Sequence, residues 1–412
     1  TAVEHVIVTK MGDMLDFPKS MLINVVVKYV KKMVPGYSLQ SAIPFKTALS
    51  EGYNLKLETT PLTHDDIAFL QYTGGTTGVA KGAVLTHKNM VANMLQASEW
   101  IKNDLVQGEE VIITALPLYH IFSLTANCLV FMNAGAHNIL ITNPRDFKGF
   151  IAELKKTHFT AITGVNTLFN ALMNSDGFAD IDFSALKLTL GGGMAVQPAV
   201  AAQWKKLTHC TLIEAYGLTE TSPAVCINPL NLKDYNGSIG LPISSTYCQL
   251  IDLDGNTVTD GEPGELCVKG PQVMKGYWNR PEETANAFTK DGWLKTGDVA
   301  KMDGNGFFYI VDRIKDMILV SGFNVYPNEI ESVIVEHKGV LECGVIGVPD
   351  EKRGEAVKAF VVKKDDSLTE AELLSFCKEH LTGYKTPDKI VFINELPKTN
   401  VGKVLRRELR SL

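Results

Sequence analysis

Residues 186–215, LKLTLGGGMAVQPAVAAQWKKLTHCTLIEA, decide the fold class. Two short runs of apolar and β-branched residues, 186–190 and 211–215, enclose three glycines and an amphipathic stretch at 197–207. Runs of that length suit strands, whereas apolar side chains that recur every three to four residues indicate a helix. The stretch therefore predicts a strand, a glycine turn, a helix and a second strand, the unit from which parallel sheets are built.

The same alternation extends toward the N-terminus. Further strand-like runs occupy residues 111–116, 138–142 and 159–164, so we expect an α/β fold with largely parallel sheets. From about residue 240 the pattern changes to short strands separated by Asp-Gly and Pro-Gly turn signals. We expect a β-rich subdomain at 240–312 that completes a large domain of residues 1–312.

The last hundred residues differ in character. Their pattern predicts an α+β domain of strand, helix, strand, strand, helix, strand and a basic tail. The helices are expected at 325–337 and 368–380, the second with Thr369 as its N-cap. Residues 313–412 carry 16 basic and 16 acidic residues, so the whole formal net charge of −6 lies in the preceding 312. A small lid domain from about Arg313, offering local positive charge to an acidic ligand, fits this distribution.

Composition argues against several classes of protein. The 412 residues are 45% hydrophobic and 21% charged, as in ordinary globular domains. A net charge of −6 is not the excess of positive charge that binding a polyanion requires, so we expect no nucleic-acid partner. Seven scattered cysteines without a C-x-x-C pair argue against a disulfide framework or zinc site and favour the cytoplasm. No uninterrupted apolar run reaches the roughly 20 residues that span a bilayer.

Two features near the N-terminus bear on whether the chain is part of a longer protein and whether it contacts a membrane. The sequence opens at Thr1 without an initiator methionine, and we expect it to be part of a longer protein. Residues 21–34 (MLINVVVKYVKKMV) predict a helix with one apolar side and three lysines. Packing on its own domain is the favoured interpretation, and peripheral contact with the inner face of the membrane is the alternative.

A glycine- and threonine-rich loop at residues 72–82 (YTGGTTGVAKG) follows a strand-like run at 67–71. Glycines let backbone amides turn toward an anion, hydroxyls add donors and a lysine adds positive charge. The lysine does not stand in a Walker A sequence, so an ordinary glycine turn is the alternative. We favour a phosphate cradle, formed by Thr73, Gly74, Gly75, Thr76, Thr77, Gly78 and Lys81.

A second glycine cluster, Gly191, Gly192 and Gly193, lies between the strand and the helix of the opening stretch. With Glu214 near the end of the next strand, it has the order of a dinucleotide-binding fingerprint. The match is weak, because Val196 occupies the place of the third small residue. The alternative is that the glycines let a flat nucleobase lie close to the backbone.

Several motifs together resemble the adenylate-forming enzyme superfamily, and within it the long-chain fatty acid–CoA ligases. Besides the loop at 72–82, they are AYGLTE at 215–220, TGD at 296–298, DR at 312–313 and PKTNVGK at 397–403. Residues 291–319 (DGWLKTGDVAKMDGNGFFYIVDRIKDMIL) are similar to the signature segment of that group. The similarity begins at about residue 67, before which family members carry additional sequence.

The resemblance implies ATP-dependent activation of a fatty acid. The carboxylate attacks the α-phosphorus of Mg-ATP, giving acyl-AMP and pyrophosphate, and the thiolate of coenzyme A then displaces AMP. Both steps build negative charge on oxygens, which requires donors, a metal ion and a lysine. The implied small molecules are a fatty acid, ATP, Mg²⁺ and coenzyme A, and a homodimer stays open.

At the phosphate end of the nucleotide, the resemblance implies four roles. Residues 73–81 would hold the β- and γ-phosphates, Glu220 would bind Mg²⁺, and Thr219 would lie beside the α-phosphate. Lys403 would bridge the substrate carboxylate and the α-phosphate as the charge stabiliser of the first step. A solvated tail lysine is the alternative, but the turn-forming residues before Lys403 favour the catalytic role.

At the nucleoside end, the resemblance implies contacts with adenine and ribose. The glycines 191–193 and Tyr216 would flank adenine, Tyr216 by stacking, and Gly217 belongs to the same motif. Asp298 would accept both ribose hydroxyls, since a carboxylate has two oxygens, and Arg313 would also reach the ribose.

The acyl and coenzyme A sides involve fewer residues. His120 would border the acyl carboxylate, with a satisfied core histidine as the alternative. The acyl chain would lie in an apolar tunnel near 121–131 and 165–172. Gly322 would line the coenzyme A tunnel, and the lid would turn near Lys315.

Rival functions share parts of this pattern. A peptide-synthetase adenylation domain would need an acid near 119–123 to hold a substrate amine, and none is there. A luciferase-like oxygenase shares the adenylation step, a medium-chain or aryl acid–CoA ligase shares both steps, and a non-catalytic acyl- or nucleotide-binding protein shares neither. Ala80, Ala215 and Ile314 depart from the usual family residues, yet every charged catalytic position is filled.

Overall fold

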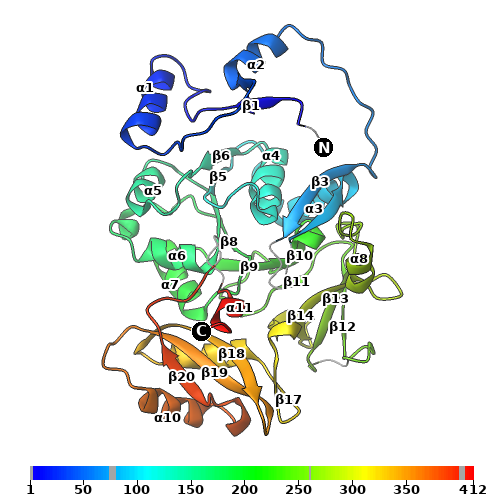
Figure 1. Ribbon diagram of the computed structural model, residues 1–412, viewed down its shortest axis with the longest axis vertical. Coiled ribbons are helices and arrows are strands. Elements are labelled where there is room, and N and C mark those ends of the chain that lie inside the picture. The colour runs from blue at the N-terminus through cyan, green and yellow to red at the C-terminus, as the bar shows by residue number, and fades with distance from the viewer. Residues whose placement is uncertain (1–2, 74–79, 259–260, 399–403) are drawn as a thin grey trace. The chain divides into compact units, whose positions relative to one another are not determined.

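The computed structural model describes residues 3–73, 80–258, 261–398 and 404–412. The chain divides into two compact units, Thr1–Leu62 and Thr63–Leu412 (Figure 1). Within the described ranges, no helix has the length and apolar character needed to cross a membrane.

The first unit is small. Its strands pair in parallel and its helices are short: β1 (Val6–Val8), α1 (Lys19–Val25), η1 (Val26–Val30), β2 (Ala42–Pro44) and α2 (Phe45–Gly52). The helix expected at 21–34 begins at Lys19 and ends at Val30, because Lys32 adopts a φ of 49°, outside the helical region. Met21 and Leu22 on this helix are largely exposed.

The largest sheet of the second unit has seven strands in the order β11-β10-β9-β8-β7-β5-β6. Five pair in parallel: β5 (Val111–Thr114), β6 (His137–Leu140), β7 (Ala161–Gly164), β8 (Leu188–Gly191) and β9 (Leu212–Gly217). Two short strands extend it in antiparallel fashion, β10 (Ala224–Ile227) and β11 (Leu241–Pro242). The predicted α/β fold is confirmed, and the five predicted strand ranges differ from the observed ones by at most two residues at either end.

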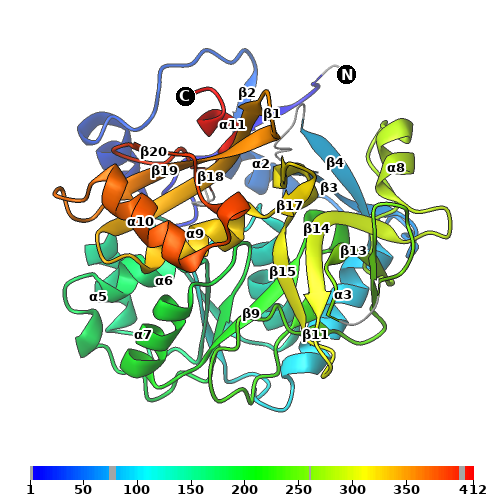
Figure 2. The same cartoon turned by 90° about the horizontal axis from the view of Figure 1, so that it is seen from below.

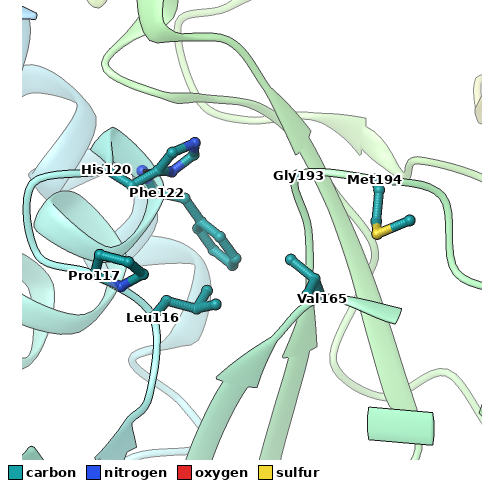
Figure 3. Close-up of a pocket in the computed structure, with 7 residues that line it drawn as sticks. All are labelled: Leu116, Pro117, His120, Phe122, Val165, Gly193 and Met194. Atoms are coloured by element: carbon teal, nitrogen blue, oxygen red, sulfur yellow. Dashed lines mark hydrogen bonds between the residues drawn. The ribbon is translucent and has the colours of Figure 1, made fainter. Parts of the chain in front are cut away.

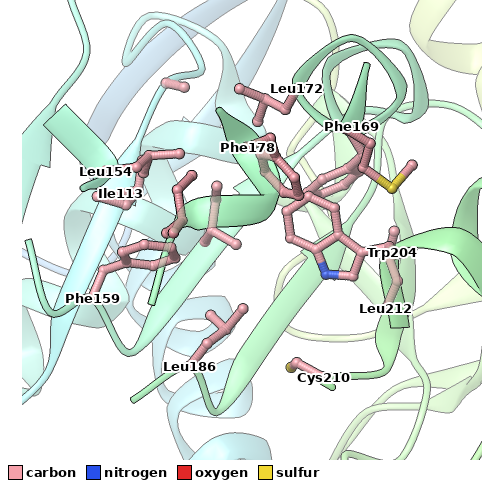
Figure 4. Close-up of a cluster of buried hydrophobic side chains, with 14 of the residues drawn as sticks. Ile113, Leu154, Phe159, Phe169, Leu172, Phe178, Leu186, Trp204, Cys210 and Leu212 are labelled. Carbon is pink, nitrogen blue, oxygen red and sulfur yellow. The ribbon is translucent and has the colours of Figure 1, made fainter. Parts of the chain in front are cut away.

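Helices connect the parallel strands. They are η2 (Ser123–Val130), α4 (Phe131–Asn133), α5 (Phe147–Leu154), α6 (Asn166–Met173), η3 (Phe178–Asp180) and α7 (Pro198–Thr208). A buried aromatic cluster packs three of them together (Figure 4). Trp204 of α7 is fully buried, with its ring centroid 4.8 Å from Phe169 and 5.5 Å from Phe178. Burying a large apolar side chain contributes about 1.5–3 kcal/mol, so this cluster gives the strand ends a rigid support.

Two antiparallel sheets complete the larger part of the second unit. β3 (Ile67–Thr73) and β4 (Lys81–Thr86) form a hairpin, and α3 (His87–Ile101) follows with Thr86 as its N-cap. The region predicted to be β-rich forms a four-stranded sheet of β12 (Tyr247–Ile251), β13 (Gly264–Lys269), β14 (Leu294–Met302) and β15 (Phe308–Arg313), with α8 (Pro281–Ala287) between β13 and β14.

The C-terminal residues form the expected α+β group (Figure 2). Five strands make one sheet: β16 (Ile318–Val320), β17 (Phe323–Val325), β18 (Val340–Asp350), β19 (Gly354–Lys363) and β20 (Lys389–Phe392). Helices α9 (Pro327–Glu336) and α10 (Glu370–His380) share one buried cluster with the sheet, and α11 (Arg406–Leu409) joins a second cluster. Thr369 caps α10 as predicted, because its side chain accepts a hydrogen bond from the Glu372 amide at 3.2 Å.

Candidate active site

Three residues predicted for the nucleoside end lie together. Asp298 of β14 is opposite Arg313 of β15 in the antiparallel ladder. The Tyr216 hydroxyl donates to Asp298 Oδ2 at 2.7 Å, and Arg313 Nε lies 3.2 Å from Asp298 Oδ1. Burial, reinforced by the Asp298 carboxylate, raises the pKa of Tyr216, so its hydroxyl remains a donor. A ribose at this carboxylate would share it with both neighbours.

A sharp bend separates Tyr216 from the next predicted residues. A Cβ atom on Gly217 would lie 1.9 Å from the Pro223 carbonyl oxygen, so only glycine fits at this close approach. The chain then forms the short helix η4 (Thr219–Thr221), which holds Thr219 and Glu220 directly beyond strand β9.

Glu220 lies near the described ends of the predicted phosphate loop. Its Oε1 accepts a 2.7 Å hydrogen bond from the Tyr277 hydroxyl, and Lys81 Nζ is 5.1 Å from the centroid of the same tyrosine ring. Thr73 and Lys81 are paired across the β3–β4 hairpin. The other loop residues, Gly74, Gly75, Thr76, Thr77 and Gly78, are outside the described residues.

Tyr277 was not predicted as a site residue. It is 57 residues from Glu220 along the chain, and it forms an isolated β-bridge with Ala83, which no sequence pattern indicates. In the ranges that the structure covers, no group of three or more His, Cys, Asp or Glu residues could hold a metal ion alone. Glu220 is therefore the carboxylate to consider for a metal that arrives with a phosphate ligand.

A small pocket opens beside His120 (Figure 3). Phe122 and Val165 point toward each other across it. Burial lowers the pKa of His120, so the imidazole is neutral near pH 7, and its Nδ1 accepts a hydrogen bond from the Phe122 amide at 3.3 Å. The lining is mostly apolar: Leu116, Pro117, His120, Phe122, Val165, Gly193 and Met194.

Not every residue of the predicted acyl tunnel lines this pocket. Phe169 is fully buried against Trp204 instead. Within the glycine cluster, Gly193 lines the pocket, whereas Gly191 pairs with Glu214 in the sheet and Gly192 lies close behind the Phe122 ring. The pocket thus joins the His120 region to the strand β8 turn.

Glu214 of β9 is a buried carboxyl group whose proton can be located by counting. The Tyr235 hydroxyl lies 2.6 Å from Glu214 Oε2 and 2.7 Å from the Val196 carbonyl oxygen. One hydroxyl hydrogen cannot serve both acceptors, so the carboxyl group must donate to Tyr235 while Tyr235 donates to Val196. Burial raises the pKa of Glu214 from 4.5 to about 8, which agrees with a protonated carboxyl at neutral pH.

This protonation makes stability depend on pH. Between pH 4.5 and 8 the folded state keeps the Glu214 proton while the unfolded state releases it, so the free energy of unfolding falls as pH rises. Glu214→Gln mimics the protonated acid and does not titrate. We expect its stability relative to the wild type to increase by about 3 kcal/mol from pH 5 to pH 7.5. Urea unfolding across this range would measure the difference, and parallel stability curves would contradict a protonated Glu214.

Two further predicted residues belong to the C-terminal part of the chain. Gly322, between β16 and β17, has a φ of 83°, and a Cβ atom there would meet nothing within 4 Å. Lys403 is outside the described residues, as are its four predecessors. The flanking residues do pair, since Lys398 and Val404 form a β-bridge and the Leu405 amide donates to the Pro397 carbonyl at 2.8 Å.

Known proteins resemble the whole chain, so the expectation that the similarity begins at about residue 67 is wrong. The family model for AMP-binding enzymes matches residues 3–278, and the model for the C-terminal domain of these enzymes matches residues 329–403. A long-chain-fatty-acid–CoA ligase of Escherichia coli O157:H7 is 59% identical over 410 residues, which cover 100% of this chain and 73% of that protein. A feruloyl-CoA synthase of Amycolatopsis is 38% identical over 352 residues, which cover 85% of this chain and 70% of that protein.

A solved structure agrees with these sequences. ATP-bound MatB from Rhodopseudomonas palustris superposes with a TM-score of 0.81 and 31% identity, covering 90% of this chain and 74% of that one. The family match extends through the strands and turns that carry Tyr216, Glu220 and Lys81. The chain therefore belongs to the AMP-binding enzyme family, with the large domain and small C-terminal domain of adenylate-forming enzymes.

Proposed function

We propose that this chain activates a long-chain fatty acid with ATP and transfers the acyl group from acyl-AMP to coenzyme A. The products are acyl-CoA, AMP and pyrophosphate. The observation that carries this proposal is the 59% identity, over the whole chain, with a long-chain-fatty-acid–CoA ligase. The arrangement of ionic groups around β9 and the apolar pocket beside Gly193 support it.

The first step builds negative charge on the α-phosphate and on the leaving pyrophosphate. Lys81 makes no ion pair with any described residue, so its charge is available to the β- and γ-phosphates that the loop at 73–78 is predicted to hold. Thr219 would lie at the α-phosphate, and Lys403 would bridge it to the attacking carboxylate. Fixed donors of this kind stabilise the transition state without reorganising during the reaction.

The site fits a magnesium ion. Mg²⁺ is commonly held by one or two carboxylates together with substrate phosphates. Glu220 Oε1 is engaged by Tyr277, whereas Glu220 Oε2 accepts no hydrogen bond from the residues that the structure describes. The ion would neutralise charge that develops on the phosphate oxygens.

Two groups would serve both steps. Asp298, held by Tyr216 and Arg313, would keep the ribose of AMP in place while the thiolate of coenzyme A attacks the acyl carbon. His120 is neutral, so it can border the acyl carboxylate without adding a charge to the transition state. Gly322 concerns only the second step: a Cβ atom there would meet nothing within 4 Å, which leaves room for the pantetheine arm of coenzyme A.

Chain length tests the substrate class. Each methylene that enters the apolar pocket should contribute about 0.8 kcal/mol, or about fourfold in specificity constant, until the pocket ends. We therefore expect kcat/KM for pyrophosphate release to rise from short to long saturated fatty acids. Acetate and an aryl acid serve as the comparison substrates, and a maximum at either would refute the fatty-acid assignment.

A second candidate is an aryl acid–CoA ligase, because the feruloyl-CoA synthase is 38% identical to this chain. The same series with ferulate added separates the two candidates. A binding protein without activity would take up ATP and fatty acid with no release of pyrophosphate.

Two finer expectations concern partners. The exposed apolar side chains of α1, next to the lysines at 28, 31 and 32, support peripheral contact with an anionic membrane. Vesicle co-sedimentation and light scattering would measure membrane contact and homodimer formation, respectively.

A further inference from the structure

Tyr277 contacts two predicted ATP-site groups of opposite charge. Its hydroxyl donates to Glu220 Oε1 at 2.7 Å, and its ring centroid lies 5.1 Å from Lys81 Nζ, within the range of a cation–π contact. Glu220 and Lys81, both described, form no ion pair with each other. A carboxylate and an ammonium group are thus kept apart by one aromatic side chain.

The backbone around Tyr277 is held on three sides. The Met274 amide donates to the Glu220 carbonyl at 2.8 Å, and the Trp278 amide donates to the Gly82 carbonyl at 2.8 Å. The Tyr277 amide itself donates to Thr284 Oγ1 at 2.9 Å. The segment therefore ties strand β4, which begins at Lys81, to the turn that carries Glu220. These bonds hold the backbone of Tyr277 close to both groups.

The hydroxyl keeps its proton over the working pH range. A phenol has an ordinary pKa of about 10, so the Tyr277 hydroxyl is a hydrogen-bond donor at neutral pH. A tyrosine hydroxyl that remains a donor fixes one oxygen of Glu220 and leaves the other to an incoming cation. Oriented carboxylates of this kind bind metal better than freely rotating ones, because the partner sets the orientation in advance.

We propose that Tyr277 is a positioning residue for Mg-ATP, and that it acts through Glu220 and Lys81. Its hydroxyl orients the Glu220 carboxylate toward the metal ion. Its ring holds the Lys81 ammonium group where it can bind the phosphates, and it prevents Lys81 from forming an ion pair with Glu220. This inference rests on the proposed function, in which Glu220 binds Mg²⁺ and Lys81 binds phosphate. It adds a residue that acts through both and touches neither substrate.

Tyr277→Phe removes only the hydroxyl and keeps the ring. We expect the Mg²⁺ concentration for half-maximal adenylation to rise about tenfold, with the KM for the fatty acid and the thioester step unchanged. Calorimetry without fatty acid should show weaker binding of Mg-ATP and unchanged binding of metal-free ATP. Tyr277→Leu also removes the ring, and it should weaken metal-free ATP binding as well, since Lys81 can then pair with Glu220.

Tyr309→Phe is the matched control, because Tyr309 donates to Asp303 at 3.0 Å in the same kind of tyrosine–carboxylate bond. It should leave the Mg²⁺ dependence at the wild-type value. Unchanged Mg²⁺ dependence in Tyr277→Phe would overturn the role of the hydroxyl, and metal-free ATP binding equal in the Leu and Phe variants would overturn the role of the ring. Glu220→Gln distinguishes a failure of the positioning role of Tyr277 from a failure of the proposed function. If Glu220→Gln also keeps the wild-type Mg²⁺ dependence, the assignment of Glu220 as the metal ligand is wrong.

Discussion

Lys403→Ala should slow acyl-AMP formation by at least about a hundredfold, a typical loss for one electrostatic donor in a transition state. The expected loss is confined to the first half-reaction. In that step the attacking carboxylate and the α-phosphate are both anionic, and a lysine between them would offset their repulsion. In the second step the nucleophile is the thiolate of coenzyme A, and thioester formation from supplied acyl-AMP should survive. Single-turnover assays of each half-reaction would measure the two rates separately.

The chain offers a matched control in Lys398. Its ammonium group is paired with Glu342 at 2.6 Å, so its charge is already engaged within the C-terminal domain. Lys398→Ala removes the same side chain five positions earlier and should leave both half-reactions close to the wild-type rates. If Lys403→Ala slowed both half-reactions by the same factor, the catalytic assignment of this lysine would be wrong.

The α/β architecture could be predicted because it depends on local patterns. Strands β5 to β9 are short apolar runs, and α7 follows a proline at its first turn, so each element is specified by adjacent residues. The capping of α10 by Thr369 is equally local. The helix over 21–34 was predicted too long, because the positive φ at Lys32 has no counterpart in the apolar pattern.

The site could be predicted only where the family motif names a residue. Tyr216, Asp298 and Arg313 were predicted through the resemblance. The β14–β15 register places Asp298 opposite Arg313, and the Tyr216 hydroxyl reaches Asp298 from the other sheet. Tyr277 and the Tyr235–Glu214 pair were missed, since their partners lie 57 and 21 residues away. Such contacts arise from tertiary packing, which a single sequence does not display.

The hinge near Lys315 is a prediction, and the contacts on either side of it bear on how it would move. On one side, Arg313 belongs to the β14–β15 ladder and pairs with Asp298. On the other side, Asp316 is buried and pairs with Arg406 and Arg410 of the C-terminal segment at 3.3 Å each. Asp312 of β15 is also held by the C-terminal part, because Arg406 lies 3.6 Å from its Oδ1 and the Asn328 amide donates to its Oδ2 at 2.7 Å. A rotation of the proposed lid near Lys315 would therefore have to break these contacts as well as change the backbone at Ile314 and Lys315.

Lys315→Pro should therefore affect the two half-reactions very unequally. Proline fixes φ near −65°, a value compatible with the 3₁₀ turn Ile314–Asp316 in which Lys315 lies. The variant should keep this arrangement of the turn and resist any other. Lys315→Ala removes the same side chain and its interactions while leaving φ free, so it is the control. If Lys315→Pro changed the rates of both half-reactions by the same factor, a hinge at this position would be contradicted.

Gly322→Leu should block only thioester formation, by a hundredfold or more, if the loop lines the path of the pantetheine arm. A Cβ atom at Gly322 would meet no protein atom within 4 Å, so a leucine side chain would start into open space and its bulk would enter the proposed tunnel. A φ of 83° adds backbone strain of roughly 1–2 kcal/mol for any residue with a Cβ atom. Gly322→Ala carries the same strain without the bulk and should keep most of the thioester rate, which isolates the steric effect.

Both half-reactions need to be measured for each glycine variant, with acyl-AMP accumulation for the first and coenzyme A consumption from supplied acyl-AMP for the second. Adenylation should stay near the wild-type rate in Gly322→Leu, because Lys403 and Gly322 would act from the same small domain in different steps. A leucine variant that lost adenylation while keeping thioester formation would show that the lid does not present these two residues in turn. Equal loss in the alanine and leucine variants would instead assign the effect to backbone strain, and the tunnel would have to lie elsewhere.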